Sequence, residues 1–187
     1  MTIKSDMTTG QNKSLQEHAM RFGTAMGLFW IFKFILLPLG FKAPFLQLLF
    51  IILTCFVPIL GYRYARTFRD KYCGGEIMFS RVYIFLIFMY FFAALLAAVG
   101  HFVYFNFIDD GFIINTYISQ LESLKVDATD EMVASIDGLT ETFSLVAEMS
   151  PIHITMQLIF QNIFYGSLLA LPTALFVMKR KKQVPDA

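Results

Sequence analysis

Charged side chains are scarce in this sequence. Only 16% of its 187 residues are Asp, Glu, Lys or Arg, whereas 57% are hydrophobic. Because a soluble domain carries about a quarter charged residues, this chain has too few of them to cover a globule in water. Its 15 basic and 14 acidic residues nearly balance, so we expect no nucleic-acid partner, which would require a basic excess. We therefore expect a membrane protein.

Motifs of catalysis and metal binding are also absent. Cys55 and Cys73 are the two cysteines, and they form neither a disulfide framework nor a CxxC metal site. The sequence contains no HExxH, no glycine-rich phosphate loop and no GxSxG. Residues 1–20 lack a signal-peptide pattern, so the first apolar span is expected to stay as an anchor. We expect no enzyme activity, no cofactor and no metal in this chain.

Long apolar runs are what the sequence does have. Four of them reach the length that a helix needs to cross a bilayer, about 20 residues. They cover about residues 23–41, 44–62, 82–105 and 152–178. The first two are separated by a short turn, which forces an antiparallel hairpin. We predict an all-α polytopic membrane protein with one domain, residues 1–187, built on four transmembrane helices.

Basic residues are concentrated on one side of these spans. Twelve of the 15 lie in the two tails and in the loop between the second and third spans, namely Lys4, Lys13, Arg21, Arg63, Arg66, Arg69, Lys71, Arg81, Lys179, Arg180, Lys181 and Lys182. Only Lys42 and Lys125 lie on the other side, while Lys33 falls within the first span. The positive-inside rule therefore predicts that both termini are cytoplasmic.

The segment between the third and fourth spans, residues 106–150, is acidic. It has nine acidic residues and one basic residue, no proline, and apolar residues at helical spacing in two stripes. We predict two amphipathic helices joined near residues 126–129, which form an extracytoplasmic cap with their apolar faces on the bundle or the leaflet surface. The alternative is an acidic face that binds a partner or a cation, with Asp109 and Asp110 as ligands.

Small residues recur at four-residue spacing within the spans. Gly23 and Gly27 form a GxxxG motif in the first span, and Gly166, Ala170 and Ala174 follow the same spacing in the fourth. Such residues allow membrane helices to approach closely. We predict packing seams inside the bundle, with dimerisation as the alternative.

Few strongly polar side chains lie at membrane depth. Lys33 belongs to the first span, His101 to the third, and Gln157 and Gln161 to one face of the fourth. Polar groups at this depth are costly, so each is a functional candidate. Two interpretations stay open. One is interhelical hydrogen bonding beside a lysine that snorkels to the surface. The other is a polar cavity for an anionic or lipid ligand, as in a small transporter.

The loop of residues 62–81 is the most distinctive stretch. Its arginines recur every third residue and extend the second helix, aromatic residues interleave with them, and Gly74 and Gly75 predict a turn. The candidate contact residues are Arg63, Arg66, Arg69, Tyr72 and Phe79. One interpretation is a loop that holds anionic lipid headgroups. The other is a docking surface for a soluble catalytic domain.

This plan resembles a family of four-span bacterial membrane proteins, domain of unknown function 4199, which is typical of Bacteroidota. The resemblance covers about residues 21–179. It rests on the GxxxG span, the tight hairpin, the arginine loop ending in Gly74–Gly75, and the long outer segment. The family supplies no catalytic residues.

Because family members are often encoded near a polyprenyl-phosphate glycosyltransferase, the resemblance implies an accessory or anchoring subunit of such an enzyme. The subunit would lie in the bacterial inner membrane among membrane lipids. A homo-oligomer also fits the sequence. The alternative function is a transporter or a lipid- or anion-binding protein that uses the cluster around Lys33.

Overall fold

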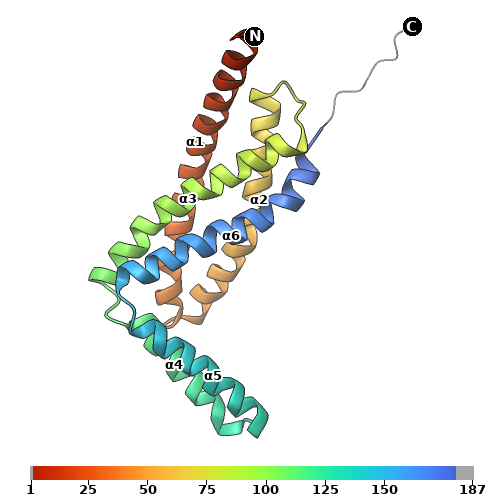
Figure 1. Cartoon of the computed structure of the whole chain (residues 1–187). Helices are drawn as coiled ribbons and strands as arrows, with labels where there is room; N and C mark the ends of the chain where they lie inside the picture. The colour runs from red at the N-terminus through yellow and green to blue at the C-terminus, as the bar shows by residue number, and fades with distance from the viewer. Residues whose placement is uncertain (1, 180–187) are drawn as a thin grey trace.

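The computed structural model describes the backbone of residues 2–179 and the side chains of residues 15–179 except residue 127. The predicted basic side chains of Lys4, Lys13, Arg180, Lys181 and Lys182 lie outside this description. The elements are α1 (Thr2–Gly40), α2 (Pro44–Tyr72), α3 (Phe79–Phe107), α4 (Phe112–Leu124), the short 3-10 helix η1 (Lys125–Asp127), α5 (Asp130–Ala147) and α6 (Pro151–Val177). The all-helical fold predicted from the sequence is confirmed (Figure 1).

Helices α1, α2, α3 and α6 are long and apolar enough to cross a membrane. Helices α1, α2 and α3 extend beyond their predicted spans, because a helix can continue past the hydrocarbon core, whereas α6 nearly matches its predicted span. Helix α2 has 29 residues, a length of about 43 Å at 1.5 Å per residue, against a hydrocarbon core of about 30 Å. The helix is therefore longer than the core is thick, and the predicted extension of the second helix through the arginines is confirmed.

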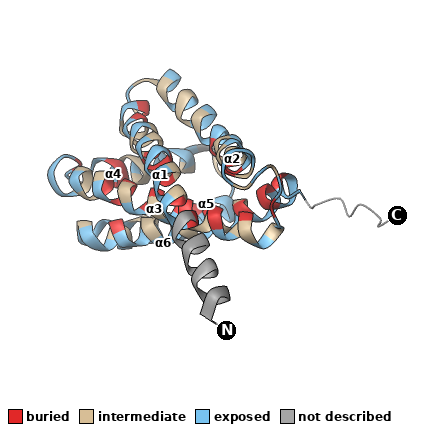
Figure 2. Cartoon of the chain, turned by 90° about the horizontal axis from the view of Figure 1, so that it is seen from above, coloured by how far each residue is buried: buried red, intermediate tan, exposed pale blue. Residues whose placement is uncertain are grey.

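The four long helices form a bundle in which α3 is the most buried member. Helix α3 packs mainly against α1 and α6, and α2 closes the bundle by packing against the same two helices. The centre is filled by fully buried α3 side chains, among them Phe85, Met89 and Tyr90. In Figure 2, buried residues lie where the helices face one another, and exposed residues cover the outer sides.

The GxxxG motif of α1 packs within the chain. A Cβ atom at Gly23 would lie 2.6 Å from the Met89 carbonyl oxygen, and one at Gly27 would lie 3.0 Å from the Ala93 carbonyl oxygen. The two glycines therefore bring the α1 backbone against α3. The predicted intramolecular seam is confirmed at this position.

Helices α4 and α5 form an antiparallel hairpin that leaves the bundle at the end opposite the start of α1 and the end of α6 (Figure 1). Tyr117 stacks on Phe143 with ring centroids 5.4 Å apart. The Lys125 ammonium lies 2.6 Å from Asp137 and 2.7 Å from Glu122 near the tip. Its hydrogen bonds to Asp137 and Glu122 raise the pKa of Lys125.

The two predicted outer helices are confirmed, but they do not lie flat over the bundle as a cap. Their apolar faces pack largely on each other, and the far end of the hairpin stands clear of the bundle (Figure 1). Ring contacts to the bundle are made at Phe41, which lies 6.0 Å from Phe112 and 5.1 Å from Tyr117. Each helix of the pair buries part of its apolar stripe against the other, as Ile113 and Ile136 show, so no cover over the bundle is needed.

Candidate functional site

The basic end of the bundle, where α2 meets α3 and α6 ends, is defined here as residues 63–81 and 177–179. The connection from α2 to α3 turns at Gly74 and Gly75, whose φ angles are 66° and 84°. These left-handed values favour glycine, and the predicted turn is confirmed. The Arg69 carbonyl accepts the N–H groups of Cys73 and Gly75 at 3.2 and 3.0 Å. Burial raises the pKa of the Cys73 thiol in this turn.

This connection is bound to the last residues of α6. The Ile77 N–H donates to the Lys179 carbonyl at 2.9 Å, and the Lys179 N–H donates to the Ile77 carbonyl at 3.0 Å. Two residues before Lys179, the Val177 carbonyl accepts a hydrogen bond from the Arg69 guanidinium at 2.9 Å. These bonds join segments about a hundred residues apart, so they fix the shape of the basic end.

The three candidate arginines differ in their surroundings. The Arg69 side chain is 15% exposed, and besides Val177 it contacts Asp70 at 2.7 Å. The Arg66 side chain is 58% exposed and lies 3.5 Å from Asp70, and Arg63 is exposed as well. Arg69 is therefore a structural residue, whereas Arg63 and Arg66 remain accessible to a ligand or a partner.

Arg69→Gln is expected to lower the free energy of unfolding by about 2 kcal/mol, because the Val177 carbonyl loses a charged donor. Arg66→Gln serves as the matched control, and its exposed ion pair predicts a change below about 0.5 kcal/mol. Both variants are unfolded by titration with SDS in a mild detergent, followed by circular dichroism. Equal effects of the two substitutions would contradict a structural role for Arg69.

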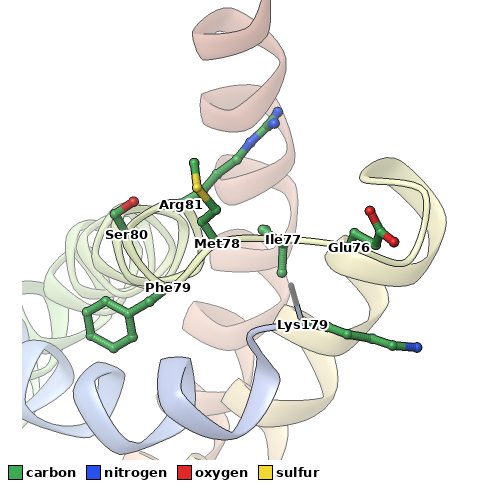
Figure 3. A pocket seen from close by; sticks show the side chains of 7 residues that line it. All are labelled: Glu76, Ile77, Met78, Phe79, Ser80, Arg81 and Lys179. Atoms are coloured by element: carbon green, nitrogen blue, oxygen red, sulfur yellow. The ribbon is translucent and has the colours of Figure 1, made fainter. Parts of the chain in front are cut away.

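The two candidate aromatic residues lie on different sides of the basic end. The Tyr72 ring is exposed and stands 3.8 Å from the His18 ring of α1. The Phe79 ring is half-buried and stacks on Tyr83 at 5.9 Å. In Figure 3, Phe79 and Arg81 point away from each other. Tyr72 thus contacts α1, whereas Phe79 contacts its own helix, α3.

Phe79 belongs to an open hollow of about 620 Å³ at the basic end. Its lining is Glu76, Ile77, Met78, Phe79, Ser80, Arg81 and Lys179 (Figure 3). Met78 is 68% exposed, and groups of both charge signs surround it. A single exposed apolar side chain is common on protein surfaces, but here it lies in a hollow together with charged groups, an arrangement that fits the apolar centre and polar rim of a small interface. Sequence reasoning missed Met78, although its place beside the Gly74–Gly75 turn was a usable signal.

The predicted polar cluster at membrane depth forms only in part. Lys33 lies within electrostatic range of His101, and its ammonium stands 5.2 Å from the centroid of the Phe50 ring. Gln157 and Gln161 are exposed on α6 and do not join them. The physical reason is that α1 packs against α2 and α3, so Lys33 is not directed toward the glutamine face of α6.

Asp109 and Asp110 precede the hairpin, and Asp109 has a structural role. Asp109 is buried, its carboxylate accepts the Ile113 N–H at 3.1 Å, and the Tyr104 hydroxyl donates to it. The bond from Ile113 satisfies a free N–H group in the first turn of α4, and the bond from Tyr104 joins this turn to α3. Among the described residues, no group of three or more His, Cys, Asp or Glu side chains is arranged to hold a metal ion.

The chain was compared with protein families, curated proteins and solved structures. The sequence model of a family described as "Protein of unknown function (DUF4199)" matches residues 21–179. No curated protein matches the chain. No solved structure matches it either. The matched range includes the GxxxG motif, the basic end and the hairpin.

Proposed function

Because this chain belongs to the DUF4199 family, whose description assigns no activity, we propose its function from its own surface. We propose that it is a non-enzymatic membrane subunit that holds a partner protein at its basic end. In this proposal the basic end faces the cytoplasm of a bacterial inner membrane, in agreement with the positive-inside rule.

The observation that carries the proposal is the hollow around Met78, whose backbone is held in place by hydrogen bonds to the end of α6. Its floor includes Ile77, which is buried and hydrogen-bonded in both directions to Lys179. A surface fixed in this way loses little conformational freedom when a partner binds, which favours affinity. Met78 supplies an exposed apolar anchor, and Glu76 and Arg81 supply a charged rim.

The partner that we propose is a membrane-associated glycosyltransferase that acts on polyprenyl phosphate. This choice is supported by the family resemblance, whose members are often encoded near such an enzyme. An enzyme with a lipid-linked substrate would work at the membrane surface, where the basic end lies. The alternative partner at the basic end is a second copy of this chain.

The test is capture of the partner from the native membrane. The chain is tagged at its C-terminus, extracted in mild detergent, and the co-purifying proteins are quantified by mass spectrometry. Met78→Asp is expected to lower partner recovery at least about ten-fold, because a charge would replace the central anchor. The matched control is Met132→Asp on the hairpin, where the side chain is also exposed, and it should leave recovery unchanged.

The accessible arginines are tested separately. Arg63→Gln with Arg66→Gln should lower recovery further while insertion is unaffected, and Arg69 is left in place because it holds α6. Equal recovery with Met78→Asp and Met132→Asp would overturn the proposed surface. Recovery of only further copies of the chain would replace the accessory role with a homo-oligomer.

A further inference from the structure

A second hollow, of about 470 Å³, opens on the side of the bundle between α2 and α6. Pro58 of α2 and Pro172 of α6 both line it, together with Ile59, Leu169 and Phe176. Proline inside a helix removes a backbone hydrogen bond and kinks the chain. The two prolines therefore lie on opposite walls of the same groove, which is called here the proline groove.

The proline groove is apolar throughout most of its lining. Thr173 is one of its polar members, and its hydroxyl is satisfied by the Leu169 carbonyl at 2.7 Å. Phe176 and Ile59 are exposed at its edges. Such a lining favours hydrocarbon over water.

The depth of the groove places it in the bilayer. At 1.5 Å per residue, Ile59 lies about 22 Å along α2 from Pro44, within a hydrocarbon core of about 30 Å. Ile59 and Tyr62 both line the groove. Arg63 and Arg66 each follow one of them by four residues, so each arginine lies on the same face of α2 one turn further along. Both guanidinium groups then reach headgroup depth, about one helical turn beyond the groove.

We propose that the proline groove holds a hydrocarbon chain of an anionic phospholipid from the surrounding bilayer, with the lipid phosphate at Arg63 and Arg66. Arginine offers a planar fork of donors that matches phosphate oxygens. Arg69 is not part of this site, because its side chain is 15% exposed and its guanidinium donates to the Val177 carbonyl. Arg66 also lies 3.5 Å from Asp70, but its side chain is 58% exposed. Charge complementarity at the end of an apolar groove is the argument for this occupant. The inference goes beyond the proposed function and does not depend on a partner protein.

The test compares two lipid probes on the full-length chain. The protein is reconstituted in vesicles of phosphatidylcholine that contain spin-labelled phosphatidylglycerol or spin-labelled phosphatidylcholine. Electron paramagnetic resonance then gives the fraction of each label that the protein immobilises. We expect phosphatidylglycerol to be preferred, by about five-fold for each basic side chain that the lipid contacts.

Two sets of variants assign the preference to the groove. Arg63→Gln with Arg66→Gln should abolish the preference, whereas Ile59→Trp should fill the groove and immobilise less of the phosphatidylglycerol label. Both sets change exposed side chains, so the fold is kept. Lys42→Gln is the matched control, because Lys42 lies beside another apolar hollow, at the hairpin end. Its ammonium rests 5.7 Å from the centroid of the Phe112 ring.

Equal immobilisation of the two labels by the unmodified chain would overturn the lipid site, as would a preference that survives the double arginine substitution. A loss of preference with Lys42→Gln would move the site to the hairpin end and overturn the proline groove. Partner capture separates this inference from the proposed function, because Met78→Asp should leave lipid selectivity unchanged and Ile59→Trp should leave partner recovery unchanged.

Discussion

Tyr90→Ala is expected to lower the free energy of unfolding by about 3 kcal/mol, among the largest effects of a single substitution in this chain. Tyr90 is fully buried on α3, and its ring stacks on Trp30 of α1 with centroids 6.1 Å apart. Two glycines make room for it. A Cβ atom at Gly166 of α6 would lie 2.8 Å from the Tyr90 side chain, and one at Gly61 of α2 would clash with its hydroxyl.

All four membrane helices therefore meet at this one side chain. Between membrane helices the favourable term is van der Waals packing, because the lipid is as apolar as the core. Removal of the ring would leave a cavity that three other helices cannot fill without moving. The measurement is the midpoint of unfolding by SDS, followed by circular dichroism of the purified chain.

Tyr90→Phe is the matched control for this prediction. The Tyr90 hydroxyl is buried and has no hydrogen-bond partner among the described residues. Its removal should be neutral or should raise the free energy of unfolding by up to about 1 kcal/mol, because an unsatisfied buried group is costly. A loss of more than about 1 kcal/mol on Tyr90→Phe would mean that the hydroxyl is bonded in the folded state.

Gly23→Ala is expected to destabilise the bundle by about 2 kcal/mol through overpacking. The added methyl group would lie 2.6 Å from the Met89 carbonyl oxygen and 2.8 Å from the Phe92 Cβ atom. Both neighbours belong to α3, and the carbonyl is backbone, so relief requires the two helices to separate. The same SDS titration measures the effect.

Gly138→Ala is expected to raise the free energy of unfolding, the opposite of the change expected for Gly23→Ala. Gly138 lies within α5, and a Cβ atom there would meet no heavy atom within 4 Å. Alanine has a higher helix propensity than glycine, so the hairpin should gain up to about 1 kcal/mol. A similar effect at both positions would show that helix propensity, rather than close packing of α1 on α3, decides the outcome at Gly23.

Much of the fold was predictable because the relevant signals are local. The bilayer imposes one length on every spanning helix, so an apolar run of sufficient length predicts a span without any knowledge of its neighbours. The turn at Gly74–Gly75 and the two hairpin helices are likewise encoded by residues close together in sequence. The continuation of α2 through its arginines was predictable from their spacing, whereas its last residue, Tyr72, was not.

The candidate site was predictable only as a region. The arginine repeat identified the loop, but its even spacing did not distinguish Arg69 from Arg63 and Arg66. That distinction depends on the Val177 carbonyl, which is 108 residues away in sequence. Similarly, the order of the spans predicted Lys33 and Gln157 in the same half of the membrane, yet they stay apart because α1 packs mainly against α2 and α3 rather than against α6.

The sequence by itself determined that this is a helical protein with four helices long and apolar enough to span a membrane, a strong charge asymmetry and an acidic hairpin. These properties depend on composition and on periodicity along one chain segment. Only the tertiary structure decided that Tyr90 occupies the centre, that Arg69 holds α6, and that Met78 stands in an open hollow. Each of these depends on which faces of distant helices meet, and that choice is made by the packing of small and large side chains across the bundle.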